Sequence, residues 1–417
     1  MLPPATPQRA AELAARASFG RLVSYLAWQW RDIAAAEDAL GDALLKALEV
    51  WPVTGVPDAP DAWLLAVAKR QLLQAARHDK LRSEPAVVAL LAQNETQDDA
   101  PAIPDARLKL LFVCAHPVLD EKVRIPLMLQ TVLGLQVAEI APALLVSPAA
   151  LAQRLVRAKQ KIRDTGLRFE EPQARELPER LSNVLESIYG AFGLSIDALD
   201  GAEARVTDLQ EEAIYLCSIV CQLLPQADGV AEAWGLLALM TFCQARRAAR
   251  TDALGRFVPL NQQNAALWSR DAIVRADQWL WAAAQKRQPG PFQLEAAVQS
   301  AHCHRLFTGT TPWSGIATLY QQINAHFPTQ GSLVAGAVAL AEAGDVAAGL
   351  QQLDAMDTRL THSFQPWWVA RGHLLCKLGK ASHALADAAY RNAIGLTAQQ
   401  TIKVHLERVR ANLSDIG

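Results

Sequence analysis

Hydrophobic residues recur along most of the chain at the three- and four-residue spacing of amphipathic helices. Within residues 10–82 the pattern breaks at WPVTGVPDAPDAW, where three prolines and a glycine predict a loop. It decays in the acidic, proline-containing residues 83–105, which predict a linker, and it returns over 106–168. After FEEPQARELPER the pattern is again helical throughout residues 177–417. The sequence therefore predicts an all-α protein of three parts joined by a linker.

The amino-acid composition favours helices and indicates where in the cell the protein is located. Alanine and leucine dominate the 417 residues, hydrophobic residues make up 51%, and stretches rich in valine, isoleucine and threonine are scarce. Six cysteines without a CxxC pair indicate reduced thiols. The N-terminus lacks the apolar segment of a signal peptide, and no run approaches the roughly 18 apolar residues of a membrane span. We therefore expect a soluble, cytoplasmic protein with no membrane partner.

The most one-sided local charge lies in LAQRLVRAKQKIR, residues 151–163. This stretch carries five cations and no acid, although the net charge of the chain is only −2. On a helical wheel the apolar stripe consists of Leu151, Leu155, Ala158 and Ile162. Arg154, Arg157 and Lys161 share an adjacent face. A helix that packs by its leucines and solvates its arginines would show the same pattern, so the interpretation depends on the flanking sequence.

The preceding residues predict two shorter helices. One runs from about Pro126 to Leu133, and the other, after Gly134, covers about residues 137–144. A tight turn then leads to Ser147, a suitable helix cap, and to Pro148 in the first turn. This is the layout of a helix-turn-helix, whose second helix enters the DNA major groove by its N-terminal half. The residues expected to face base edges are Ala149, Ala150 and Gln153, and those expected to hold phosphates or a guanine are Arg154, Arg157 and Lys161.

Residues 31–51 show the opposite charge. The expected apolar face consists of Leu40, Leu44, Ala47, Leu48 and Trp51. Asp38, Asp42 and Glu49 lie together on the far side, and Glu37 flanks the apolar face. Such an acidic side suits either a solvated surface or a basic partner.

After the proline-rich loop, DAWLLAVAKRQLLQAARHDKLR predicts a basic helix. Its expected inward side consists of Leu64, Leu65, Ala68, Leu72, Ala75 and Ala76. The expected basic side consists of Lys69, Arg70, Arg77 and Lys80, with Trp63 at its margin. An aromatic ring beside a basic strip suits single-stranded nucleic acid, where bases stack. Trp63 is alternatively a residue of the core.

The order of these segments resembles the extracytoplasmic-function group of the bacterial sigma-70 family. RDIAAAEDALGDALLKALEVWP and GVPDAPDAWLLAVAKR, with the pattern W-x-x-x-x-A-(K/R)-(K/R), are similar to the first conserved sigma domain. AEIAPALLVSPAALAQRLVRAKQKIRD is similar to the second. LAQRLVRAKQKIRDTGLRFEEP and ELPERLSNVL, followed by a long helical extension, resemble the subgroup with a C-terminal tetratricopeptide-like (TPR-like) extension.

The resemblance implies a transcription initiation factor that directs core RNA polymerase to promoter DNA. It implies no catalytic site, metal or cofactor. Residues implied to contact the polymerase clamp helices are Glu37, Asp38 and Asp42, and those implied to hold the melted −10 strand are Trp63, Lys69, Arg70 and Arg77. The helix that begins at Pro148 would read the −35 element, and its domain (106–168) would meet the polymerase flap. The first domain is expected at 10–82 and the linker at 83–105.

The C-terminal part, 177–417, contains two similar segments. ALAEAGDVAAGLQQLDAM and CKLGKASHALADAAYRNAIGL share a helix–glycine–helix layout, with Gly344 and Gly379 placed 35 residues apart. This spacing is near the roughly 34-residue period of TPR arrays, so the sequence predicts a TPR-like array, with a generic helical bundle as the alternative. Such an extension would regulate the front half, by folding back over it or by receiving a signalling protein.

Three features depart from the family pattern. Pro142 lies inside the expected short helix, where it costs about 3 kcal/mol unless the helix kinks. Val137 leaves that helix without a side-chain cap, and IYGAFGLSID stands where relatives have a phrase containing N-E-G-Y. These departures leave a second interpretation open, a helical-repeat adaptor with a degenerate sigma-like front half. An enzyme is disfavoured: no nucleophile or acid–base motif is present, and adjacent residues such as His302 and Cys303 diverge on a helix.

Overall fold

The protein is all-helical where it is described. The computed structural model describes residues 7–80, 106–141, 144, 146–170, 172–173, 175–197, 203–224, 229–397 and 399–414. Helices make up 78% of the structure. No strand occurs among the described residues, apart from one isolated bridge between Thr251 and Phe257. The predicted all-α class is confirmed. The predicted linker at 83–105 lies outside the described residues. The chain forms two compact units, Met1–Ala191 and Phe192–Gly417.

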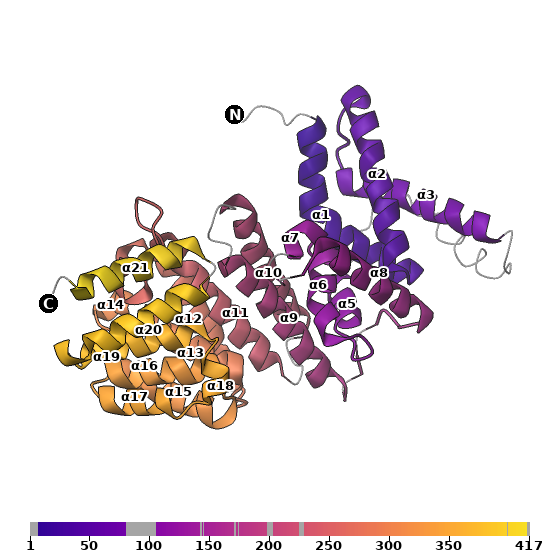
Figure 1. The fold of residues 1–417 in the computed structure, drawn as a ribbon. Helices are drawn as coiled ribbons and strands as arrows, with labels where there is room; N and C mark the ends of the chain where they lie inside the picture. The colour runs from indigo at the N-terminus through magenta and orange to yellow at the C-terminus, as the bar shows by residue number, and fades with distance from the viewer. Residues whose placement is uncertain are drawn as a thin grey trace. The chain divides into compact units, whose positions relative to one another are not determined.

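The first unit is built from seven helices and the start of an eighth among its described residues (Figure 1). They are α1 (Pro7–Trp30), α2 (Ile33–Thr54), α3 (Pro60–Lys80), α5 (Arg107–Cys114), α6 (Glu121–Thr131), α7 (Val137–Ile140), α8 (Pro148–Asp164) and α9 (Leu177–Asp197), which reaches the unit boundary. α1 packs against α2, α3 and α5, and α6 packs against α5, α7 and α8. α8 also contacts α2. The two segments predicted as separate domains, 10–82 and 106–168, therefore lie in one compact unit.

α2 is longer than the pattern predicted. Asp32 caps it by accepting the Ala35 N–H at 3.1 Å, and the helix continues through Pro52 to Thr54. It ends at Gly55, which has a φ of 85° and donates its N–H to the Trp51 carbonyl at 3.0 Å. The loop expected to begin at 51 therefore begins at 55, because a proline near the C-terminal end removes only one hydrogen bond and the chain tolerates it there.

The buried stripes of α2 and α3 are narrower than expected. In α2 the stripe follows Ile33, Ala36, Leu40, Ala43, Ala47 and Trp51. Leu48, expected on the apolar face, is 43% exposed, and Leu44 is half-buried. In α3 the inward side ends at Leu72, since Ala75 is exposed and Ala76 is half-buried. Four of the seven buried residues of α2 are alanines, and the leucines that flank this stripe stay at its edge.

The helices before α8 also differ from their predicted bounds. α6 begins at Glu121 rather than near Pro126, because Asp120 caps it by accepting the Lys122 N–H at 2.8 Å. α7 ends at Ile140, so the expected helix 137–144 is only one turn. Val137 supplies no side-chain cap. Instead, a side chain inside the helix caps it, because the Glu139 carboxylate accepts the Gln136 N–H at 2.8 Å. Pro142 lies outside the described residues.

The second unit continues the helical pattern (Figure 1). Its described helices are α10 (Glu203–Leu223), α11 (Val230–Ala245), α12 (Arg270–Gln285), α13 (Pro291–Cys303), α14 (Arg305–Thr308), α15 (Trp313–His326), α16 (Gln330–Glu342), α17 (Val346–Asp354), α18 (Thr358–Thr361), α19 (Gln365–Lys377), α20 (His383–Leu396) and α21 (Gln400–Ser414). Between α11 and α12 runs an irregular segment, 246–269, with the short turns η1 (Arg247–Ala249), η2 (Leu260–Gln262) and η3 (Ala265–Leu267).

Consecutive helices of this unit pack side by side. α11 packs on α12 and α13, α15 on α16, α16 on α17 and α19, and α19 on α20, which is followed by α21. Gly344 joins α16 to α17 with a φ of 114°, and Gly379 follows α19 with a φ of 101°. The predicted helix–glycine–helix layout is therefore present in both segments, because each hairpin turns through a backbone conformation that favours glycine.

α11 and α13 approach each other through small and polar groups. A Cβ on Gly235 would lie only 2.8 Å from the Gln293 backbone nitrogen, so the helices meet backbone to backbone. Glu232 on α11 caps α13 by accepting the N–H groups of Phe292 at 2.9 Å and Gln293 at 3.2 Å. Burial raises the pKa of Glu232, and these hydrogen bonds oppose that rise. No described helix is long and apolar enough to cross a membrane.

Candidate nucleic-acid interface

α8 is built as the sequence predicts. Ser147 caps it, with its Oγ accepting the Ala150 N–H at 3.3 Å, and Pro148 occupies the first turn, where a missing N–H costs nothing. The buried side consists of Leu151, Leu155, Ala158 and Ile162, as predicted. Local capping and the spacing of four apolar residues therefore determine which face of α8 meets solvent.

The residues expected to contact DNA lie on the open face of α8. Ala149, Gln153, Arg154, Arg157 and Lys161 are exposed, and Ala150 is half-buried. Lys161 is also tied to the protein, since its Nζ donates to the Val118 carbonyl at 2.6 Å. The N-terminal half of the helix thus presents small side chains and one amide, with cations along its flank.

A hollow of about 380 Å³ lies between α8 and the start of α6. Its charged lining residues are Asp120, Lys122, Arg154, Arg157 and Lys161. Four cations and one carboxylate give this α6–α8 hollow a net positive charge, which suits an anion such as a phosphate. Sequence reasoning missed Lys122, because it stands in the mixed-charge run DEKVR and only the packing of α6 on α8 brings it to the basic face.

The other two cations of α8 point away from this face and meet α2. Lys159 pairs with Glu37 and also donates to Gln130 Oε1 at 2.8 Å. Only 9% of the Lys159 side chain and 18% of the Glu37 side chain is exposed. Arg163 pairs with Asp32 at 3.0 Å. Burial raises the pKa of Glu37 above its ordinary value, although Lys159 opposes the rise.

The three acidic residues predicted as one contact surface therefore lie in two different environments. Asp38 and Asp42 are exposed on α2, while Glu37 is partly buried against Lys159. Glu37 lies near the N-terminal end of α2, which is the part that α8 covers. The sequence pattern places Glu37 at the margin of the apolar face of α2. A residue at such a margin is within reach of a second helix that packs on that face.

The basic side of α3 has one described cation that lies over an aromatic ring and one that faces solvent. Trp63 packs edge-on against Trp51, with 5.5 Å between ring centroids, and is half-buried, which fits its alternative role in the core. Lys69 lies over the Tyr25 ring, with 5.1 Å from Nζ to the centroid. Arg70 is exposed, and the side chain of Arg77 lies outside the described residues.

Comparisons with known proteins place the chain in a family. Residues 180–284, from α9 to α12, match a family of unknown function, DUF6596. The chain is 34% identical over 411 residues to an uncharacterized protein of Rhizobium meliloti (strain 1021), and the match covers 96% of this chain and 95% of that protein. The chain belongs to that protein's family. No solved structure matches it. Nothing in these comparisons points to catalytic activity.

Chemically reactive clusters are not found in the part of the chain that the structure describes. No group of three or more histidine, cysteine, aspartate or glutamate residues there is arranged to hold a metal ion. Burial raises the pKa of Cys114 to about 12 and that of Cys303 to about 11, so both thiols stay protonated at neutral pH. His302, beside Cys303 in the sequence, packs edge-on against Trp313 instead of joining it as a ligand.

Proposed function

We propose that this protein is an RNA polymerase sigma factor of the extracytoplasmic-function group, which directs core polymerase to specific promoters. The observation that carries the proposal is α8. It is a capped helix whose leucines are buried, while Gln153 and Arg154 face solvent in its N-terminal half and Arg157 faces solvent just beyond the midpoint. A helix presented in this way fits the major groove, with small residues allowing close approach and arginines reaching phosphates or a guanine.

The surroundings of α8 support this use. α6, the one-turn α7 and α8 follow one another as a helix-turn-helix does, with α8 in the position of the recognition helix. The α6–α8 hollow adds Lys122 to three cations of α8, so that four cations on one side of the helix would hold phosphates. An adaptor protein would have no need for this concentration of cations on one exposed face.

Asp38 and Asp42 are suited to the polymerase contact that the resemblance implies, because both carboxylates are exposed on one side of α2. The clamp helices and flap of core polymerase would be the partners. The proposal includes a cytoplasmic location, since core polymerase acts there.

The contact between α2 and α8 represents a closed state of the proposed factor. Reading a −10 strand with α3 and a −35 duplex with α8 requires two sites that are separated along the promoter, at about 3.4 Å for each intervening base pair. In the structure, α8 instead lies directly on α2 through Lys159 and Arg163. Promoter binding would therefore separate α8 from α2 and free Glu37 for the polymerase.

We further propose that the second unit is a TPR-like regulatory extension. α16 begins at Gln330 and α19 at Gln365, 35 residues later, and each is followed by a glycine turn and a second helix. This repeat length supports a stacked array, whose inner face is the usual binding surface of such proteins.

The proposal is tested by run-off transcription with purified core polymerase. Templates are genomic fragments that include the region upstream of the protein's own gene. We expect a defined start site that requires the protein and disappears with Arg154→Ala/Arg157→Ala. The matched control is Arg275→Ala/Arg408→Ala, which removes two exposed arginines of the second unit and should leave the start site intact.

Salt dependence identifies the phosphate contacts. Lys122→Ala should weaken binding to all promoter sequences alike and lower the slope of log affinity against log salt by about 0.9. A well-folded protein that does not bind core polymerase would contradict the sigma proposal and favour the helical adaptor.

A further inference from the structure

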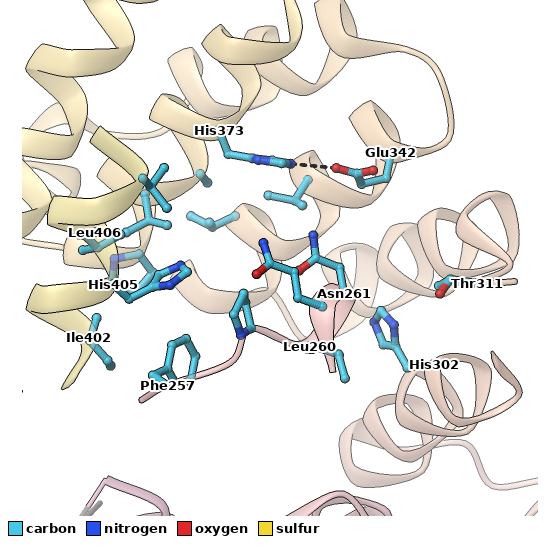
Figure 2. A pocket seen from close by; sticks show the side chains of 18 of the residues that line it. Phe257, Leu260, Asn261, His302, Thr311, Glu342, His373, Ile402, His405 and Leu406 are labelled. Atoms are coloured by element: carbon cyan, nitrogen blue, oxygen red, sulfur yellow. Dashed lines mark hydrogen bonds and ion pairs between the residues drawn. The ribbon is translucent and has the colours of Figure 1, made fainter. Parts of the chain in front are cut away.

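A cavity of about 550 Å³ lies inside the second unit, and its size is typical of a small-molecule site (Figure 2). Its walls come mainly from α16, α19, α21 and the irregular segment between α11 and α12, with single residues from α13, α14, α15 and α20. Figure 2 shows side chains from these elements, among them His302, Asn261 and His405, converging on one space. Three helices, α16, α19 and α21, supply most of the helical lining, and the cavity lies on the face that they form together.

The irregular segment closes this face and is held there by one arginine. The guanidinium of Arg305 donates to the carbonyl oxygens of Leu260 at 3.0 Å, Asn261 at 3.0 Å and Gln263 at 2.8 Å. The same group stacks on the Trp268 ring, 4.8 Å from its centroid. Four contacts from one residue fix the segment as a wall, so the cavity is formed before any ligand arrives.

The cavity is mainly apolar. Phe257, Val338, Val369, Ile402 and Leu406 line it from the segment and from three different helices. Apolar walls of this kind favour a ligand that buries hydrocarbon surface, since each square ångström removed from water contributes about 25 cal/mol.

The charged groups at the cavity are already engaged with other groups of the protein. Glu342 accepts hydrogen bonds from His373 at 2.7 Å and pairs with Lys377 at 3.0 Å. Burial alone would raise the pKa of Glu342, but these two partners lower it, so the carboxylate is ionised and paired. Arg305 keeps its positive charge, but its guanidinium is held by the three carbonyls and the Trp268 ring. An ionic ligand would have to displace these contacts, which favours an uncharged one.

Two histidines supply hydrogen-bonding groups. Burial, together with Arg246 and Arg305, lowers the pKa of His302 to about 4, and burial lowers the pKa of His405, so both rings are neutral at pH 7. Each neutral imidazole carries one N–H donor and one acceptor nitrogen. These groups favour a ligand that brings a hydrogen-bond acceptor.

We propose that this cavity binds a small, uncharged, mainly apolar organic molecule that carries at least one hydrogen-bond acceptor. The proposal rests on the second unit alone, so its failure would leave the sigma proposal untouched. An extended peptide is the other class of ligand that a helical array takes. It is disfavoured because the chain's own segment already occupies the peptide-sized part of this face.

Nile red, an uncharged apolar dye whose emission shifts to the blue in apolar sites, is the probe for the full-length protein. We expect saturable, blue-shifted binding with one site per chain. Val369→Trp fills the cavity and should weaken dye binding at least 10-fold. Val338→Phe does the same with a smaller insertion, in case the tryptophan variant does not fold. Leu385→Trp, at a position on α20 that is 61% exposed, is the matched control and should bind as the parent does.

Two results would overturn the proposal. One is unchanged dye affinity in both filled variants while circular dichroism shows them folded. The other is displacement of the dye at micromolar concentration by the free peptide FVPLNQQN, residues 257–264 of the chain, which would assign the site to extended peptides. Loss of binding in the filled variants, with no displacement by the peptide, supports the proposal.

Discussion

Gly20 in α1 is a position where one methyl group decides whether two helices can meet. A Cβ there would overlap the carbonyl oxygen of Val132, at the end of α6, whereas a Cβ on Gly41 of α2 meets no atom within 4 Å. The first glycine is required by the close approach of two backbones, and the second is not.

Gly20→Ala should therefore destabilise the first unit by about 1–3 kcal/mol, because the helices must shift to admit the methyl group. Gly41→Ala should stabilise it by up to about 1 kcal/mol, because alanine favours the helix. Urea unfolding of the full chain, followed by circular dichroism, measures both. Equal effects at the two positions would contradict the packing described for α1 and α6.

His302 should make stability depend on pH. Its pKa is lowered from 6.5 to about 4 by burial and by Arg246 and Arg305, so between these values the unfolded chain binds a proton that the folded chain does not. Stability should fall as the pH decreases from about 6.5 to about 4, by at most about 3 kcal/mol and by less where water screens the ring.

His302→Phe keeps an aromatic ring beside Trp313 and should flatten this part of the pH profile. The neighbouring ring of His304 is exposed, so His304→Phe should leave the profile as it is. Thermal unfolding of the full chain across this pH range compares the variants. A parent profile that is retained in His302→Phe would mean that other groups cause the pH dependence.

At the scale of elements, the link between α2 and α8 rests on a few polar contacts. Lys159 and Glu37 are both largely buried, so neither charge has water to replace its partner. Lys46 and Glu49 form a comparable pair within α2, at 2.8 Å, but both side chains are more than half exposed. The two pairs differ in solvent access, which decides how much an ion pair contributes.

A double-mutant cycle with Glu37→Gln and Lys159→Met should give a coupling energy of about 1–3 kcal/mol. The same cycle with Lys46→Met and Glu49→Gln should give less than about 0.5 kcal/mol. Unfolding free energies of the four variants in each cycle supply both values. Coupling near zero for the first pair would show that α8 does not lie on α2 in solution.

Across the whole molecule, the boundary between the units does not coincide with the boundary that the sequence pattern suggested. The junction predicted near 168–177 precedes α9, yet residues 177–191 belong to the first unit. Arg180 donates to the Phe112 carbonyl, Asn183 accepts from Arg124 at 3.1 Å, and Gly190 lies against Ile125. α9 therefore completes the packing around α5 and α6.

A chain ended at Arg168 should be less stable than one ended at Asp197. It loses the hydrogen bond from Arg180 to Phe112 and the one from Arg124 to Asn183. Both have a charged guanidinium donor, and such bonds contribute about 1.5–3 kcal/mol each. We expect the melting temperature of the shorter chain to be at least about 5 °C lower. Differential scanning calorimetry of both chains measures it, and equal melting temperatures would place α9 outside the first unit.

Much of the candidate interface was predictable because its causes are local. Ser147, Pro148 and the spacing of Leu151, Leu155 and Ile162 determine the start and the buried face of α8 through capping and helical periodicity. The same kind of local signal predicted the glycine turns at Gly344 and Gly379. Helix bounds near Pro52 and Pro126 were wrong, because a proline inside a helix is tolerated when caps and packing outweigh one lost hydrogen bond.

The sequence by itself determined the all-helical class, the buried and basic faces of α8, and the local hairpins of the second unit. Only the tertiary structure decided that Lys122 joins the basic face, that Glu37 pairs with Lys159, and that Arg305 closes a cavity with residues more than 40 positions away. The reason is physical: capping and periodicity act within a few residues, whereas these partners depend on which helices pack together.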